Sequence, residues 1–197
     1  MKFNADNKHG KIGEAAATSL ITAMGGAVKD VTDNEEMQEL DIDFLACLND
    51  INFTLECKYA SIDGGADVFE TIKNTNTQEK GWAYGTKADY VTIYKASINQ
   101  IHIIDVSALQ SWLPAVEDKY RVYYGKTYSK FYKNQILYES KNVRIPYRDL
   151  IRNNVLTNIF EYDTLKKYGF VCYKKSILVI LYMKAQKAAR IFLTRKE

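Results

Sequence analysis

Two short apolar segments, residues 42–47 and 53–59, constrain the fold of this chain more than any other feature. Both have the length and the β-branched or aromatic content of strands, and the residues between them include Asn49 and Asp50. Asn and Asp tolerate the positive φ angles that tight hairpin turns require. The pattern therefore predicts two antiparallel strands joined by a short turn.

The second predicted strand carries charged residues on one face only. Because alternate side chains share a face of a strand, Glu56 and Lys58 point together, whereas Cys57 points into apolar packing on the other face. Asp43 opens the first strand, so pairing of the strands would bring its carboxylate beside that of Glu56. Two converging carboxylates form a hard-oxygen site that suits Mg²⁺, with Mn²⁺ as a substitute, and the Cys57 carbonyl is a further candidate ligand.

A divalent cation held there would give the hairpin a hydrolytic chemistry. Such an ion acts as a Lewis acid on a phosphodiester and lowers the pKa of a bound water. The ammonium of Lys58 could orient the attacking water or stabilise the charge that develops on the phosphate. The residues thus favour a metal-dependent phosphodiesterase.

Residues 7–24 predict a helix that adds another carboxylate. Apolar residues recur there at the three-four spacing of one buried face, Asp6 is a suitable cap, and Gly25-Gly26 ends the pattern. Glu14 lies on or beside the buried face, where it could contact the metal or its water. The predicted catalytic set is Glu14, Asp43, Glu56 and Lys58.

The remaining elements define the fold class. The sequence predicts a short strand at 26–31, a charged loop at 32–38, a helix at 67–76, strands at 90–94 and 100–106, a short helix at 106–113 and a buried strand at 176–183. This order indicates an α/β fold, with a mixed central β-sheet flanked by helices.

Charge divides the 197 residues into two parts. Residues 1–118 carry 9 Lys/Arg against 19 Asp/Glu, whereas residues 119–197 carry 18 against 5 and hold 11 of the 15 tyrosines. We therefore predict a nuclease core over 1–118 and a basic, Tyr-rich extension over 119–197 that completes the core or is appended to it.

Interleaved basic and aromatic residues suit a surface that binds DNA, since they meet both phosphates and bases. Candidate substrate contacts in the extension are Lys126, Lys130 and Lys133. Two alternatives stay open. The basic part could lie against the acidic part, and the tyrosines could simply pack on one face of a β-rich extension.

The pattern resembles the PD-(D/E)xK nuclease superfamily, which includes restriction enzymes and Holliday-junction resolvases. The matching elements are Gly13-Glu14, Asp43 and the Glu56-Cys57-Lys58 strand. Residues 81–90 resemble the helix-to-strand junction that follows the motif in several members, and similarity extends to about residue 152. The resemblance implies a mixed α/β core, divalent-metal phosphodiester hydrolysis and a homodimer.

The chain departs from the family pattern at several positions. Ile42 replaces the proline that names the motif, as in many members, and Asp41 competes with Asp43 for the role of strand-initiating carboxylate. Gln78 and Tyr84 lack the spacing of the exonuclease helix motif. Residues from 153 onward match no family pattern.

Thr86 and Lys87 lie near the predicted site. Either could touch a phosphate, although contacts within the loop end are the more ordinary role for such residues.

Other classes of site and location are disfavoured by the composition. His9 and His102 are far apart and have no cysteine pairs nearby, so a structural zinc site lacks ligands. The three cysteines are widely spaced, which fits a reducing compartment. Residues 1–10 lack the apolar stretch of a secretory signal, and no apolar run is long enough for a bilayer, so we expect a cytoplasmic protein without a membrane partner.

Together these features favour a metal-dependent DNA endonuclease of recombination, repair or phage DNA processing, acting like a junction resolvase. A sequence-specific restriction endonuclease, which would read base edges with its C-terminal part, is the alternative within the enzyme class. A catalytically silent DNA-binding protein on the same fold is the alternative from another class. Branched DNA, single-stranded DNA and RNA are all compatible substrates.

Overall fold

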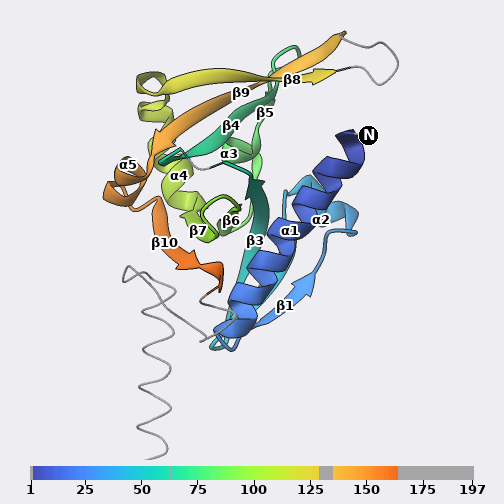
Figure 1. The fold of residues 1–197 in the computed structure, drawn as a ribbon, viewed down its shortest axis with the longest axis vertical. Helices are drawn as coiled ribbons and strands as arrows, with labels where there is room; N and C mark the ends of the chain where they lie inside the picture. The colour runs from blue at the N-terminus through green and yellow to red at the C-terminus, as the bar shows by residue number, and fades with distance from the viewer. Residues whose placement is uncertain (1, 63, 129–134, 164–197) are drawn as a thin grey trace, which may run out of the picture.

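The computed structural model describes residues 2–62, 64–128 and 135–163, and within them two β-sheets form the framework of the protein (Figure 1). The described strands of the large sheet are, in spatial order, β1 (Ala27–Asp30), β2 (Phe44–Leu48), β3 (Ile51–Ala60), β6 (Tyr90–Lys95), β7 (Gln100–Asp105) and β10 (Leu156–Glu161). Those of the small sheet are β5 (Glu79–Lys80), β4 (Ala66–Asn74), β9 (Ile136–Pro146) and β8 (Arg121–Tyr128). Since β3 pairs with β2 antiparallel and with β6 parallel, the large sheet is mixed, as predicted.

The helices of the described chain pack around these sheets. They are α1 (Lys2–Ala23), α2 (Glu35–Glu39), α3 (Trp82–Gly85), α4 (Val106–Trp112) and α5 (Tyr147–Arg152), with 3₁₀ turns η1 (Leu113–Ala115) and η2 (Glu117–Lys119). Helices and a mixed central sheet confirm the α/β class. No helix in the described ranges is long and apolar enough to cross a membrane.

The predicted hairpin is confirmed as β2 and β3. Asn49 and Asp50 have φ angles of 53° and 63°, the left-handed values that a tight two-residue turn requires. Leu48 is the Cα partner of Ile51, and the register runs down to Phe44 opposite Leu55. The turn chemistry thus fixes the pairing that brings Asp43 to the side of β3.

Helix α1 covers one face of the large sheet (Figure 1). Its buried residues Ala17, Leu20 and Ile21 pack in one core with Leu55 and Cys57 of β3. The helix begins at Lys2, so Asp6 lies inside it and is not its cap. Its end agrees with the prediction, since Gly25 has a φ of 80° directly after the last turn.

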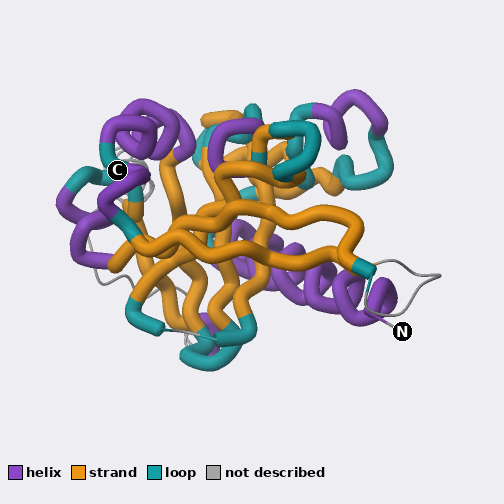
Figure 2. The backbone as a smooth tube through the Cα atoms, turned by 90° about the horizontal axis from the view of Figure 1, so that it is seen from above, coloured by secondary structure: helices purple, strands orange, loops and turns teal. Residues whose placement is uncertain are grey.

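The small sheet, α3 and α4 cover the opposite face. Phe69 of β4 and Val143 of β9 share a core with Val91 and Ile104 of the large sheet and with Leu109 of α4. Figure 2 shows the long β8–β9 pair reaching toward the same side of the molecule as the N-terminal end of α1. Arg121 and Tyr123 of β8 and Arg144 of β9 line the cavity described below.

Two local predictions are wrong. Residues 67–76 are not a helix, because Ala66–Asn74 forms β4 and pairs with β9, a partner distant in sequence. Residues 32–38 are not only a loop, because Asn34 caps α2 by accepting a hydrogen bond of 3.0 Å from the Met37 amide.

The chain after residue 118 contributes to both sheets. β9 pairs with β4 in the small sheet, and β10 pairs with β7 in the large one. The predicted strand at 176–183 lies outside the described residues.

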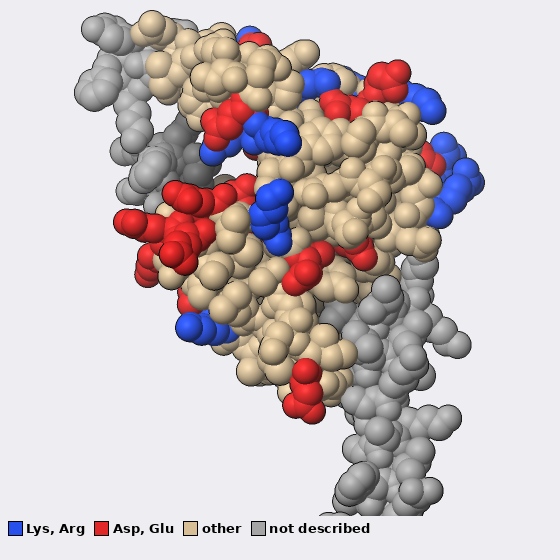
Figure 3. Space-filling model, turned by 180° about the vertical axis from the view of Figure 1, so that it is seen from behind, with Lys and Arg blue, Asp and Glu red and all other residues tan. Residues whose placement is uncertain are grey.

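Acidic side chains of the N-terminal part gather around α2 (Figure 3). Glu35, Glu36 and Glu39 are all exposed. Within the described ranges, the ion pair that joins the basic part to the acidic part is Lys141 with Glu117, and neither residue belongs to α2. The described strands of the basic segment therefore form no ion pair with the α2 side chains.

Candidate active site

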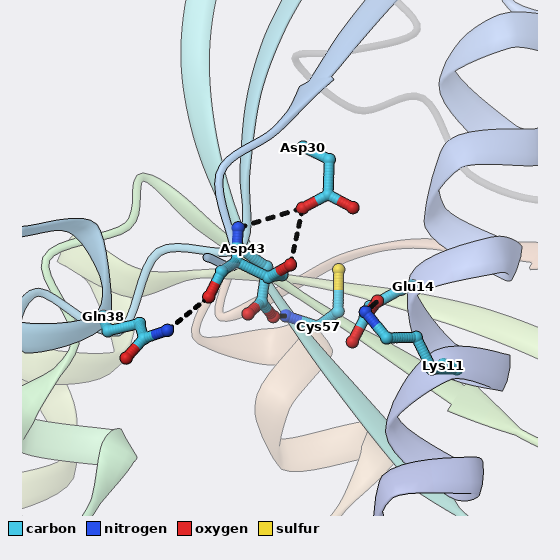
Figure 4. A network of polar contacts seen from close by, with 7 residues as sticks. Lys11, Glu14, Asp30, Gln38, Asp43 and Cys57 are labelled. Atoms are coloured by element: carbon cyan, nitrogen blue, oxygen red, sulfur yellow. Dashed lines mark hydrogen bonds and ion pairs between the residues drawn. The ribbon is translucent and has the colours of Figure 1, made fainter. Parts of the chain in front are cut away.

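The carboxylate of Asp43 is held against β3 by the main chain (Figure 4). Asp43 directly precedes β2, and its amide donates to the Leu55 carbonyl at 2.9 Å. Its Oδ2 atom accepts a hydrogen bond of 2.7 Å from the Cys57 amide. The residue directly before β2 therefore places a fixed carboxylate beside the middle of β3.

Glu56 and Lys58 lie together on the face of β3 opposite Cys57. Glu56 is only 5% exposed, and it forms an ion pair with the Lys58 ammonium. The ammonium also lies 5.9 Å from the centre of the Trp82 ring. The buried acid Glu56 and the partly exposed cation Lys58 thus form an ion pair beside Asp43.

The pKa values of the three groups are coupled. Burial raises the pKa of Glu56 to about 7, with Lys58 opposing the rise and Asp43 adding to it. Burial also raises the pKa of Asp43, although the Cys57 amide and Lys58 oppose it. Burial alone would lower the pKa of Lys58, but its neighbour Glu56 outweighs that effect and the pKa is raised.

The two carboxyl groups also act on each other: the charge of Asp43 adds to the raised pKa of Glu56, whereas Glu56 is among the groups that lower the pKa of Asp43. Two buried acids with raised pKa values beside an ammonium are a feature of sites with a chemical role.

The donor set fits a hard divalent cation. Mg²⁺ is commonly held by one or two carboxylates, with water and substrate phosphate completing its shell, and Asp43 and Glu56 supply such a pair. The N–H and C=O of one strand residue face the same side, so the Cys57 carbonyl lies on the side where its amide meets Asp43. Among the described residues no three His, Cys, Asp or Glu side chains gather closely enough to hold an ion.

Glu14 approaches this group from α1 and has an ion-pair partner of its own. Its carboxylate pairs with the ammonium of Lys11 at 2.7 Å, one turn back on α1. It acts on Asp43 through its charge, which is among the causes that raise the pKa of that acid. The structure thus brings Asp43, Glu56 and Lys58 together, and Figure 4 shows Glu14 on α1 beside Cys57.

A glycine brings α1 close to the motif strand. A Cβ atom on Gly13 would lie 3.0 Å from the Lys58 carbonyl oxygen, tighter than almost all real contacts. The absence of a side chain at this position allows the helix to approach β3 and places Glu14 near the site.

Asp41 and Glu70 add negative charge on the Lys58 side. Asp41 sits in a turn with a φ of 51°, so it precedes the strand and does not share a strand face with Asp43. Its charge contributes to the raised pKa of Glu56 and of Lys58. Sequence reasoning missed Glu70, because its segment was expected to be a helix; burial raises its pKa and Lys58 opposes that rise.

The loop before β6 braces the Asp41 turn. The Thr86 hydroxyl donates to the Asp41 carbonyl at 2.9 Å, and the Lys87 amide donates to the Leu40 carbonyl at 2.8 Å. The Lys87 side chain is exposed.

Of the candidate substrate contacts in the basic segment, Lys126 lies on β8 with its ammonium 3.9 Å from the Glu139 carboxylate. Lys130 and Lys133 lie outside the described residues.

A cavity of about 840 Å³ adjoins the site. Residues of α1, of the C-terminal end of β3 and of β4, β8 and β9 in the small sheet line this cavity. The lining includes Lys58, Tyr59 and His9 below, and Arg121, Tyr123 and Arg144 above. The ammonium-bearing residue of the site therefore also lines a large, partly basic cavity.

Neither protein-family models nor curated protein sequences match this chain. A search of solved structures finds a bacterial homing endonuclease with a TM-score of 0.38 and 19% identity, covering 53% of this chain and 67% of that one. A score this low carries no argument about activity.

Proposed function

We propose that this protein is a divalent-metal-dependent endonuclease that hydrolyses phosphodiester bonds of DNA in the cytoplasm, in the manner of a junction resolvase. The observation that carries the proposal is the meeting of Asp43, Glu56 and Lys58 on two paired strands. Asp43 and Glu56 would hold Mg²⁺ or Mn²⁺ with the carbonyl of Cys57.

A purely structural role explains this arrangement poorly. Burying two carboxylates together is unfavourable, as the raised pKa values of both show. An apolar pair on these strands would give the folded state a lower free energy. A cation-binding site accounts for the two acids, because a bound cation stabilises both carboxylates in their charged form.

Each residue has a task in the reaction. When bound, the cation supplies Lewis-acid activation of the phosphodiester and lowers the pKa of water. Lys58 would donate hydrogen bonds from Nζ to a phosphate oxygen and stabilise its growing charge. Asp43 keeps its orientation through the Cys57 amide. Glu14 would act through solvent between α1 and the site.

The test is incubation of the purified full chain with branched, nicked, linear duplex and single-stranded DNA in Mg²⁺ or Mn²⁺. We expect cleavage by wild type and a loss of at least about a hundredfold for Glu56→Gln and Lys58→Met, since each removes a group that acts in the transition state. The exposed residues Glu36 and Lys119 provide matched controls as Glu36→Gln and Lys119→Met.

The cleavage pattern separates the alternatives. Discrete fragments from plasmid DNA would favour a restriction endonuclease, and preference for a four-way junction would favour a resolvase. Absence of cleavage, or equal cleavage by wild type and Glu56→Gln, rejects the enzyme and leaves a DNA-binding protein.

The superfamily resemblance also supports a homodimer. Sedimentation velocity on the full chain at micromolar concentration, with and without DNA, tests this part separately. A monomer under both conditions contradicts it.

A further inference from the structure

Two arginines face each other across neighbouring strands of the small sheet. Arg121 of β8 is the Cα partner of Arg144 of β9, and both side chains line the cavity of about 840 Å³. Like charges directly opposite each other on one face of a sheet destabilise it. The Arg121–Arg144 pair is therefore expected to bind an anion, which would relieve the repulsion between the two guanidinium groups.

The described protein offers this pair little neutralisation. Neither arginine belongs to an ion pair among the described residues. The Arg144 guanidinium donates one hydrogen bond to the Gly64 carbonyl, whereas Arg121 has no hydrogen-bond partner within the described ranges. Arg121 is exposed toward the cavity and keeps its donors for solvent or a ligand.

The carboxylate on the same sheet face has other partners. Glu70 lies one row away, since Glu70 pairs with Asn142 while Val68 pairs with Arg144. Lys58 and Ser140 both lower the pKa of Glu70, and neither arginine is among the main causes of its shift. Glu70 thus belongs to the Lys58 side of the site and does not neutralise the arginine pair.

The cavity joins this pair to the proposed active site. Lys58 lines the same cavity, together with Tyr123 on the arginine side. On the opposite side His9 stacks on Tyr59, with ring centres 4.5 Å apart and planes 5° from parallel. A groove with cationic groups and aromatic rings suits a nucleic acid strand, because phosphates meet the cations and unpaired bases can stack on the rings.

We propose that Arg121 and Arg144 form a clamp for one phosphate group of the substrate strand, within the cavity that Lys58 also lines. The inference rests on the proposed function, because it places the clamp and the reacting phosphate on one strand. Two guanidinium groups match phosphate geometry through paired N–H donors. The clamp binds a phosphodiester that is not cut and so sets where along the strand the cut falls.

The experiment measures binding without cleavage. A fluorescein-labelled single-stranded oligonucleotide and its duplex are titrated with the full chain in EDTA, and anisotropy is read at several salt concentrations. For Arg121→Gln we expect about tenfold weaker binding, and a salt slope smaller by about one unit because one phosphate contact is lost. Arg148 lies on α5 with its side chain 81% exposed, and it does not line the cavity. Arg148→Gln is the matched control and should change affinity less than about twofold.

Two further variants guard against a folding defect. Because Arg144 also bonds to Gly64, Arg144→Gln combines loss of binding with a local structural effect, whereas Arg144→Lys keeps the charge and should recover part of the affinity. Arg121→Gln removes no hydrogen bond among the described residues and relieves the repulsion with Arg144, so its thermal midpoint should equal or exceed that of wild type. Wild-type affinity and salt slope in Arg121→Gln overturn the clamp.

The outcome is distinct from the fate of the nuclease proposal. Arginine-dependent binding with no cleavage in Mg²⁺ supports the clamp and rejects the proposed catalysis. If cleavage depends on Glu56 but the affinity for the oligonucleotide is the same in wild type and in both arginine variants, only the clamp is rejected. Competition by inorganic phosphate tests the source of the anion. If it displaces the oligonucleotide at an equal phosphate concentration, the site binds small anions and the strand assignment is wrong.

Discussion

The main-chain amide of Cys57 donates a hydrogen bond of 2.7 Å to Oδ2 of Asp43. Because this donor is a main-chain group, substitutions at Cys57 other than proline leave it in place, and the hydrogen bond needs only an oxygen acceptor on residue 43. Asp43→Asn keeps an acceptor and removes the charge. We expect it to fold as wild type and to lose Mn²⁺ binding, as measured by calorimetric titration.

The companion variant Asp43→Ala separates position from charge. It removes the acceptor for Cys57 and should cost about 1–3 kcal/mol of unfolding free energy, because a partly buried donor loses its charged partner. Asp118→Asn, at an exposed carboxylate, is the control for both measurements. Full Mn²⁺ binding by Asp43→Asn would exclude Asp43 as a ligand.

The raised pKa of Glu56 predicts that the metal-free protein is destabilised by its own site. The folded pKa of about 7 exceeds the ordinary value of 4.5, so the stabilising contribution is complete below pH 4.5 and is lost as pH rises through 7. A shift of this size corresponds to about 3 kcal/mol at most. Glu56→Gln has no such loss.

Urea unfolding in EDTA at pH 5 and pH 8 measures this effect. Wild type should lose more stability than Glu56→Gln between the two values, and the difference between the proteins isolates Glu56 from other titrating groups. Adding Mn²⁺ at pH 8 should restore wild type and leave Glu56→Gln unchanged. Parallel pH dependence of the two proteins contradicts the prediction.

A buried ion network links the two sheets. Asp67 of β4 accepts a hydrogen bond of 3.0 Å from Lys95 of β6, and its other oxygen lies 2.9 Å from Nδ1 of His102 of β7. All three side chains are essentially inaccessible to solvent. Asp67→Asn removes the Asp67 charge from beside the buried Lys95 ammonium and should cost about 3–5 kcal/mol. Asp118→Asn is the matched surface change.

The same network predicts acid sensitivity. Burial acts to raise the pKa of Asp67, but His102 and Lys95 outweigh it and hold the pKa below its usual value. A lowered folded pKa contributes stability above the ordinary value of 3.8 and loses it as pH falls through the folded pKa. Denaturation followed from pH 5 to pH 2 should therefore show a loss in wild type that Asp67→Asn lacks.

Local chemistry explains what the sequence predicted well. The Asn49-Asp50 turn and the alternation around Glu56 are encoded within a few residues, so the hairpin and the meeting of Asp43 with Glu56 and Lys58 follow from them. Elements whose state depends on distant partners were missed. β4 becomes a strand because it pairs with β9, more than sixty residues later, and Glu70 joins the site only through that pairing.

The arginine pair shows the same limit. Arg121 and Arg144 are 23 positions apart in the numbering, and only the register of β8 on β9 makes them neighbours. A charge count detects that the segment is basic but cannot say which cations face one another. Lys126, by contrast, is a candidate only because it belongs to the basic run, and its ammonium lies 3.9 Å from the Glu139 carboxylate.

The close approach of α1 to β3 yields a prediction with an internal control. Gly13→Ala would place a Cβ atom 3.0 Å from the Lys58 carbonyl oxygen, which is main chain and cannot rotate away. Gly10→Ala, one turn earlier, meets only Oε1 of Glu14 at 3.8 Å, an ordinary contact. Both changes replace a helical glycine and gain up to about 1 kcal/mol of helix propensity.

Only Gly13→Ala also displaces the helix, at a cost of about 1–3 kcal/mol. We therefore expect Gly10→Ala to raise the thermal midpoint and Gly13→Ala to lower it. The displacement should carry Glu14 away from Asp43, so Gly13→Ala should also lose DNA cleavage while keeping its helix content by circular dichroism. If both variants are stabilised equally, α1 does not need the glycine to reach the motif strand.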